Sequence, residues 1–339
     1  MIRFLIQRLV SGLTSAWLVA TTVFVVIRLI PGDPSIVMAG PDATPVELAL
    51  IRTQLGLTGP LWQQYLSFLG SLLRGSLGIS IRTNQPVSGE LLTRFPATME
   101  LAISALVLAT VIAVPLGIMS AVRRGSSLDQ AARVTTLLGV GMPVFWLALL
   151  GTWAFAYKIP IFPVSGRLDP EMSLGRITGF AVPDAIIQGH PDIAWSAIHH
   201  LALPAIVLAL PVLAISSRLM RASLLEVLGE DYIRTARAKG LGQRTVLLRH
   251  GLRNALQPVI TVLGLQLAVL LSGTILVEQI FAWPGIGSYV YQSIQSRDYP
   301  VVQGAILLFA LVYVFVNTLV DIGYGLLDPQ TRTALMDHQ

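Results

Sequence analysis

The sequence contains no cysteine and few charged residues. Without cysteine there can be no disulfides, no thiolate metal sites and no cysteine nucleophile. Charged residues make up 12% of the 339 residues and apolar residues 54%, whereas a soluble protein carries roughly a quarter charged residues. The composition therefore predicts a chain that lies in lipid.

Common enzyme signatures are also missing. The chain has no HExxH, no GxSxG and no GxxxxGK[ST], so we expect no catalytic site and no phosphate-binding P-loop of its own. His199 and His200 are adjacent, and adjacent residues do not share a helix face, so we expect no metal site there. The net charge is +5, but its cations are dispersed around apolar segments without interleaved aromatics. We therefore do not expect the chain to bind nucleic acid.

Six segments are long and apolar enough to cross a hydrocarbon core of about 30 Å, which takes about 20 helical residues. The predicted spans are residues 9–30, 98–121, 134–157, 201–220, 257–280 and 301–326. The first span is too long for a signal-peptide core, and we interpret it as an uncleaved anchor. The predicted fold is all-α and polytopic, with six transmembrane helices.

The distribution of Lys and Arg predicts the orientation of these spans. More than half of the 23 Lys and Arg residues fall on one side if the N-terminus is cytoplasmic. We therefore expect both termini and a loop at 222–256 to be cytoplasmic, and loops 31–97 and 158–200 to be extracytoplasmic.

The first outer loop is expected to be ordered. Thr44 to Glu47 reads as a capping box with proline at the first helical position, and Gly56 would end that helix. Residues 60–74 form an amphipathic pattern that Gly75 would terminate, either as a lid that only packs or as a docking surface for an external partner. The 158–200 loop, rich in Pro, Gly and Asp, is expected to be an irregular cap.

Polar residues within the spans are few. Arg28, Glu100, Arg218 and Glu278 lie near span ends, and we expect their side chains to snorkel toward the membrane surface. Asp321 lies deeper in the sixth span. Because no second carboxylate lies this deep in the spans to form a proton relay with it, we expect Asp321 to make a packing or polar contact with a neighbouring helix. Prolines in spans four and five, together with small and polar residues in span five, fit a pathway wall. The candidate pathway residues are Pro204, Pro211, Gln266, Ser272 and Gly273.

The stretch 230–258 carries six cations between two apolar segments. Its first part predicts a short helix that begins near Glu230 and ends at Gly240. One face would be apolar and the other cationic, and so short a helix needs a surface to hold it. The candidate contact residues are Asp231, Tyr232, Ile233, Arg234, Thr235, Ala236, Arg237, Lys239 and Gly240. The alternative is a basic loop that only sets topology on anionic lipid.

Ordered motifs resemble the permeases of ABC importers, in particular the peptide/nickel branch and its dipeptide permeases. The run from Asp231 to Leu241, followed by His250 to Ala255 and Pro258, resembles their cytoplasmic loop. The likeness continues along nearly the whole chain, at Arg8 with Pro31–Pro34, Leu55–Leu57, Gly75–Gly78, Phe95–Thr98, Phe281–Gly285, Arg297–Val301 and Asp328–Pro329. The general importer motif would have Glu and Ala at Arg234 and Thr235, a departure that the peptide/nickel branch shares.

The resemblance implies a type I importer permease in which residues 232–240 are the coupling helix and residues 1–339 form one permease domain. Its implied partners are a second homologous permease, two cytoplasmic ATPases and an extracytoplasmic peptide-binding protein. ATP and Mg would bind the ATPases, and this chain would need no cofactor and catalyse no reaction. It would lie in the bacterial inner membrane and import dipeptides or short peptides. Alternatives are glutathione, opine-like compounds or nickel chelates, a free-standing secondary carrier, or an intramembrane enzyme.

Overall fold

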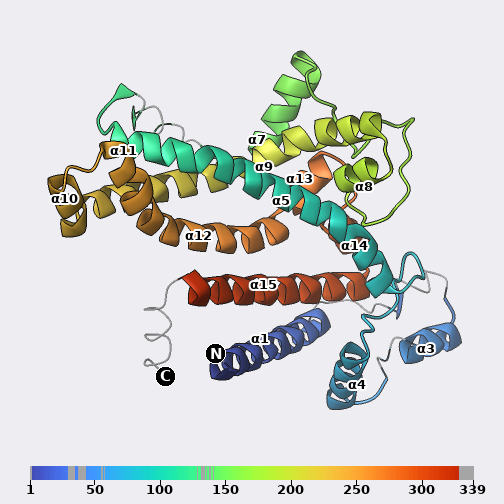
Figure 1. Cartoon of the computed structure of the whole chain (residues 1–339). Helices are drawn as coiled ribbons and strands as arrows, with labels where there is room; N and C mark the ends of the chain where they lie inside the picture. Colours follow the sequence, from blue (N-terminus) through green and yellow to red (C-terminus); the bar gives the residue numbers. More distant parts are fainter. Residues whose placement is uncertain are drawn as a thin grey trace. The chain divides into compact units, whose positions relative to one another are not determined.

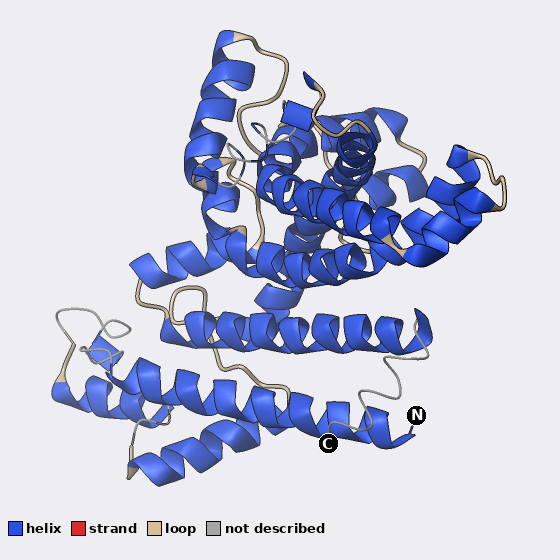
Figure 2. Ribbon diagram, turned by 90° about the vertical axis from the view of Figure 1, so that its left-hand side faces the viewer, coloured by secondary structure: helices blue, strands red, loops and turns tan. Residues whose placement is uncertain are grey.

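The computed structural model describes residues 2–29, 35–36, 43–54, 56, 58–127, 129–130, 134, 136, 139 and 141–327. Within these residues the structure is helical, with an isolated bridge between Ile79 and Pro86 and no strand (Figure 2). The chain forms two compact units. The first comprises Met1–Thr98 and Pro284–Gln339, and the second comprises Met99–Trp283. The single permease domain expected from the sequence stays a prediction.

The first unit is built on two long helices that run side by side (Figure 1). They are α1 (Ile2–Leu29) and α15 (Tyr299–Leu327). A Cβ added to Gly12 would lie 3.0 Å from Cγ1 of Val314, so the glycine permits close approach of the two helices. The unit also contains α3 (Pro45–Gln54), α4 (Leu61–Leu73), α14 (Ile286–Gln295) and the first residues of α5 (Val87–Val122).

A buried carboxylate organises the turn that precedes α5. Asp298, just before α15, accepts hydrogen bonds from Ser80 Oγ at 2.5 Å and from the N–H groups of Ile81 at 3.1 Å and Arg82 at 3.2 Å. Its side chain is buried, and these three donors satisfy it. The turn and the start of α15 are thereby fixed to one another.

The two short helices of the first unit begin and end where the sequence predicts. Thr44 N–H donates to Glu47 Oε2 at 2.8 Å and Glu47 N–H to Thr44 Oγ1 at 3.4 Å, which confirms the capping box of α3. The N–H and the hydroxyl of Thr44 both donate to the Glu47 carboxylate and lower its pKa below the usual value. Gly56 and Gly75 have φ angles of 64° and 73°, as left-handed stops require.

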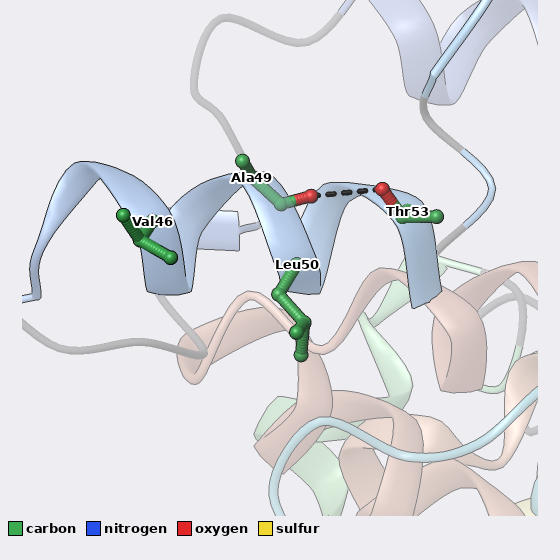
Figure 3. A pocket seen from close by; sticks show the side chains of 4 residues that line it. All are labelled: Val46, Ala49, Leu50 and Thr53. Atoms are coloured by element: carbon green, nitrogen blue, oxygen red, sulfur yellow. Dashed lines mark hydrogen bonds between the residues drawn. The ribbon is translucent and has the colours of Figure 1, made fainter.

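Helix α4 packs one face on α1 and leaves another face uncovered. The hydroxyls of Tyr65 and Thr21 lie 2.6 Å apart, and Arg28 Nε donates to Gln64 Oε1 at 3.0 Å. Trp62 and other apolar side chains on α4 remain exposed. Among the described residues, a shallow depression on α3 is lined by Val46, Ala49, Leu50 and Thr53 of that helix (Figure 3). Neither feature decides between a packing lid and a docking surface.

The second unit is arranged around the longest helix of the described residues, α9 (Pro191–Gly229). After α5 come α7 (Val144–Gly151), the π-helix η1 (Thr152–Lys158), α8 (Ala181–Ile187) and α9. They are followed by α10 (Asp231–Ala238), α11 (Gln243–Thr245), the π-helix η2 (Val246–Gly251), α12 (Leu252–Gly273) and α13 (Ile275–Ile280). Helices α7, α8 and α12 all pack on α9 (Figure 1).

Five helices among the described residues are long and apolar enough to span a membrane, and they match five of the predicted spans. The remaining span, 134–157, corresponds in part to the shorter apolar segment Val144–Lys158, and part of its beginning lies outside the described residues. Several helices are longer than predicted. At 1.5 Å per residue α9 extends about 58 Å, well beyond a hydrocarbon core of about 30 Å.

The 158–200 segment is less irregular than expected, because it contains α8 and the start of α9. Asp184 on α8 accepts hydrogen bonds from the N–H groups of Ile177, Thr178 and Gly179 at 2.8–3.1 Å and from Thr178 Oγ1 at 2.6 Å. Burial alone would raise the pKa of Asp184, but these hydrogen bonds together lower it to about 2.

Two carboxylates expected to snorkel are instead buried. Glu100 on α5 pairs with Arg167 and accepts the N–H of Val182 at 2.9 Å, while Arg167 also donates to the carbonyl of Gly179 at 2.8 Å. Glu278 on α13 is fully buried and accepts a hydrogen bond from Thr274 Oγ1 at 3.0 Å. The expectation was wrong because each carboxylate finds donors within the second unit, which sequence position alone does not reveal.

Candidate coupling surface and pathway helices

The short helix α10 follows the end of α9 directly. Glu230 has an extended backbone, and its carbonyl accepts the N–H groups of Ile233 at 3.1 Å and Arg234 at 3.2 Å, which starts the helix. Gly240 closes it with φ 79°, and its N–H donates to Arg237 O at 2.9 Å. The helix therefore covers Asp231–Ala238, close to the predicted limits.

The apolar face of α10 is covered by the chain itself. Ile233 is fully buried and Ala236 is 7% exposed, and both pack with Val246 of η2 and with Leu228 of α9. Tyr232 is 40% exposed, and its hydroxyl accepts a hydrogen bond from Asn254 Nδ2 at 2.8 Å. The surface that so short a helix needs is thus provided by η2 and α9 of the chain itself, and a contact of Ile233 and Ala236 with a partner stays a prediction.

The opposite face of α10 is exposed and cationic. Arg234, Arg237 and Lys239 are all exposed, as are Arg244 and Arg249 in the following segment. Arg234 Nη1 lies 3.1 Å from Asp231 Oδ1, an ion pair between exposed groups that contributes little to stability. We call the exposed residues Asp231, Tyr232, Arg234, Thr235, Arg237, Lys239 and Gly240 the α10 surface.

Three helices meet beneath this surface in one apolar cluster. Ala121 of α5, Met220 and Leu224 of α9, and Ala255 and Val259 of α12 are buried together. Leu228 packs on this cluster and also on the apolar face of α10. In Figure 1, α10 lies at the left, where α9 ends and the chain returns through α11 to the start of α12. Leu228 therefore connects α10 to the helices of the cluster.

The candidate pathway residues lie on α9 and α12, which pack against each other. Pro204 is buried and Pro211 is half-buried, both within the unbroken α9, and Gln266 is half-buried on α12. Ser272 and Gly273 end α12, and their exposure lies outside what the structure describes. A role of these residues in a pathway stays a prediction.

Sequence reasoning missed a buried ion pair near the α10 surface. Arg221 of α9 donates from Nε to Asp129 Oδ1 at 2.7 Å and from Nη2 to Oδ2 at 3.1 Å. The two residues are 92 positions apart, so no local pattern indicates their contact. Among the described residues no cluster of His, Cys, Asp and Glu could hold a metal ion.

Comparison with known proteins supplies the family. Residues 113–333 match the family described as binding-protein-dependent transport system inner membrane component, and residues 1–102 match the N-terminal region of such membrane components. The chain belongs to this permease family. The permease is thus a multi-pass membrane protein and a transport component of an ABC importer.

Three relatives are similar over nearly the full length of the permease. It is 44% identical over 338 residues to the dipeptide transport system permease protein DppB of Escherichia coli strain K12, covering 98% of this chain and 99% of the relative. It is 44% identical over 333 residues to the di/tripeptide transport system permease protein DppB of Pseudomonas aeruginosa strain UCBPP-PA14, with the same coverage. A probable D,D-dipeptide transport system permease protein DdpB of Escherichia coli K12 is 45% identical over 313 residues, 92% of each chain.

Among solved structures, a crystal structure of an amino acid ABC transporter with histidines matches the permease with a TM-score of 0.46 at 15% identity, covering 69% of this chain and 92% of that chain. This likeness is too low to carry an argument. Several residues of the predicted family motifs, namely Pro31–Pro34, Leu55, Leu57 and Asp328–Pro329, lie outside the described residues, as do the side chains of Arg8 and Asp321.

Proposed function

We propose that this permease imports dipeptides or short peptides, with a second permease chain, two cytoplasmic ATPases and an extracytoplasmic peptide-binding protein. The observation that carries the proposal is the identity of about 44% to permeases named for dipeptide transport, across nearly the full length of both chains. The permease breaks no bond in the peptide. ATP and Mg are bound by the ATPases, in keeping with the absence of a P-loop from the sequence.

The α10 surface is the part of this chain that we assign to the ATPases. Its apolar face is held by η2 and α9, so the helix can be pushed as a rigid body, while its cations are exposed and can meet an acidic rim. This arrangement favours a docking role over a loop that only sets topology, since a topology signal needs charge but no ordered helix. Both termini and the α10 surface would then be cytoplasmic.

Transport would follow from rigid-body switching. ATP binding would draw the ATPases together and move α10, and the cluster of α5, α9 and α12 would carry that movement into the membrane. Alternating exposure of a path along α9 and α12 would follow, with Pro204, Pro211 and Gln266 on those helices.

A purified complex tests this function. The permease, its co-expressed partner permease and ATPases would be reconstituted in liposomes with the binding protein, and ATP hydrolysis would be measured with dialanine, glutathione or a nickel chelate. We expect dialanine to stimulate hydrolysis and to accumulate inside. Stimulation by glutathione or the nickel chelate alone would refute the substrate, and uptake by the permease without ATPases would refute the importer mechanism in favour of a secondary carrier.

A further inference from the structure

We propose that Asp129 and Arg221 form a rigid link that makes α5 move together with α9 when α10 is displaced, and that the pair therefore sets how tightly ATP hydrolysis is coupled to transport. The inference rests on the proposed function, because it presumes that the ATPases act on α10. Both residues are positioning residues that touch neither substrate nor nucleotide.

The carboxylate of Asp129 is fully buried and joins three parts of the second unit. It accepts both hydrogen bonds of the Arg221 fork, at 2.7 Å and 3.1 Å, and the N–H of Gly125 at 3.0 Å. It also accepts the hydroxyl of Ser120, near the end of α5. One side chain thus fixes α9, the last turn of α5 and the turn that follows α5.

The pair lies close to the helix that we assign to the ATPases. Arg221 precedes the last residue of α9, Gly229, by eight positions, which is about 12 Å along the helix. Helix α10 begins two residues later, at Asp231. Arg221 is thus within about two turns of the point where a displacement of α10 enters α9.

The two helix backbones are also unusually close next to the pair. A Cβ added to Gly117 of α5 would lie 2.6 Å from Met220 Cβ and 2.7 Å from the carbonyl oxygen of Ser217. Only glycine fits at this distance, so α5 and α9 are in direct backbone contact one turn from Ser120. The close contact and the ion pair together hold α5 against α9, so that the two helices resist both moving apart and sliding along each other.

At this place an ion pair fixes the relative orientation of two helices more closely than apolar packing does. Apolar residues of similar volume can replace a buried ion pair at little cost in stability, whereas a charged pair fixes register. The two parallel hydrogen bonds of an arginine fork also constrain orientation, which a lysine cannot reproduce. We therefore propose that the pair keeps α5 in a fixed orientation on α9 while α10 is displaced.

Three variants in the complete reconstituted complex test the link. Arg221→Lys keeps the charge but loses the fork. Asp129→Asn combined with Arg221→Gln removes both charges, so that neither is left buried alone. Arg218→Gln, an exposed cation on the same helix, is the matched control. The measured quantities are the amount of assembled complex and the number of ATP molecules hydrolysed per dialanine taken up.

We expect Arg221→Lys and the double variant to assemble with their ATPases and to hydrolyse at least about fivefold more ATP per dialanine, a typical size for a lost coupling between sites. Arg218→Gln should match the wild type. An unchanged ratio in both test variants would overturn the proposal. If only one test variant assembles with its ATPases, the ATP-to-dialanine ratio of that variant decides the test. If neither assembles, the ion pair serves folding and the proposal is wrong. Failure of the wild-type complex to couple at all would instead refute the proposed function.

Discussion

At the scale of single residues, Gly240 shows how a local backbone conformation supports the α10 surface. Gly240 has φ 79°, and apart from Gly240 and its two neighbours in the chain no heavy atom of the described residues lies within 4 Å of the place where its Cβ would be. A side chain here would meet no clash, so its cost is conformational and not steric. A left-handed conformation costs an ordinary L-residue roughly 1–2 kcal/mol, and a β-branched residue more than asparagine.

Gly240→Val should therefore misalign the end of α10 and reduce both ATPase co-purification and dialanine uptake, with membrane insertion unchanged. Gly240→Asn should lie close to the wild type, because asparagine tolerates the left-handed region. Gly75→Val is the matched control: Gly75 has φ 73°, has the same open surroundings and ends α4. Normal uptake in Gly240→Val with wild-type ATPase binding would argue against a coupling role for this turn.

The ionised carboxylate of Asp184 holds the loop at residues 177–179 through the hydrogen bonds that it accepts. Its pKa is lowered from 3.8 to about 2, so its contribution to stability is fully present above about pH 4 and is lost only as the pH falls toward 2. Asp184→Asn should loosen residues 177–179 at neutral pH, since a hydrogen bond to a charged group contributes about 1.5–3 kcal/mol. We expect trypsin to cleave after the exposed Arg176 roughly tenfold faster, with cleavage after Arg124 as the internal control. The wild-type loop should keep its protection between pH 8 and pH 5, and a loss of protection within that range would contradict the assignment.

At the scale of elements, α10 separates two tasks between its two faces. Ile233 and Ala236 hold the helix to η2, while Arg234, Arg237 and Lys239 are exposed. Ile233→Ala would remove a fully buried side chain at a cost of about 2–5 kcal/mol and so would damage the helix itself. Changes on the exposed face alter no packing, so they test docking without that complication.

Replacing Arg234, Arg237 and Lys239 together by Gln should leave the thermal stability of the solubilised permease within about 0.5 kcal/mol of the wild type for each site. The same variant should weaken ATPase binding, most strongly at low salt, because the lost attraction is between solvent-exposed charges. Affinity would be measured by titration of purified ATPase at low and high ionic strength. Replacing the exposed Arg74 and Arg82 by Gln provides the control, and an equal loss there would point to a general charge effect.

Sequence patterns predicted the elements well where the determinants are local. The capping residues Thr44 and Glu47, the glycine stops and five of the six apolar spans each lie within one segment, and the structure confirms them. The determinants that were missed are distant in sequence. Asp129 and Arg221 are 92 positions apart, Glu100 and Arg167 are 67 apart, and the cover of Ile233 comes from Val246. A single sequence records none of these pairings, because each depends on how the helices pack.

At the scale of the whole molecule, the distribution of the cations predicts the orientation of the permease in the membrane, and this prediction is open to a direct test. Helix α9 joins the 158–200 segment to α10 and, at about 58 Å, exceeds the bilayer core, so its two ends should emerge on opposite sides. The chain contains no cysteine, so single introduced cysteines report their own positions alone.

Lys239→Cys on the α10 surface and Arg176→Cys in the 158–200 segment replace exposed residues in the segments that follow and precede this helix. In intact bacteria a membrane-impermeant maleimide that passes the outer membrane should label Arg176→Cys within minutes and leave Lys239→Cys unlabelled until the inner membrane is opened. Uptake of dialanine by each variant would show that it is folded and inserted. Labelling of Lys239→Cys in intact cells would place α10 outside and remove the ATPases from its reach. Labelling of both positions from one side would mean that α9 does not cross the bilayer, and the path along α9 and α12 would have to be abandoned with it.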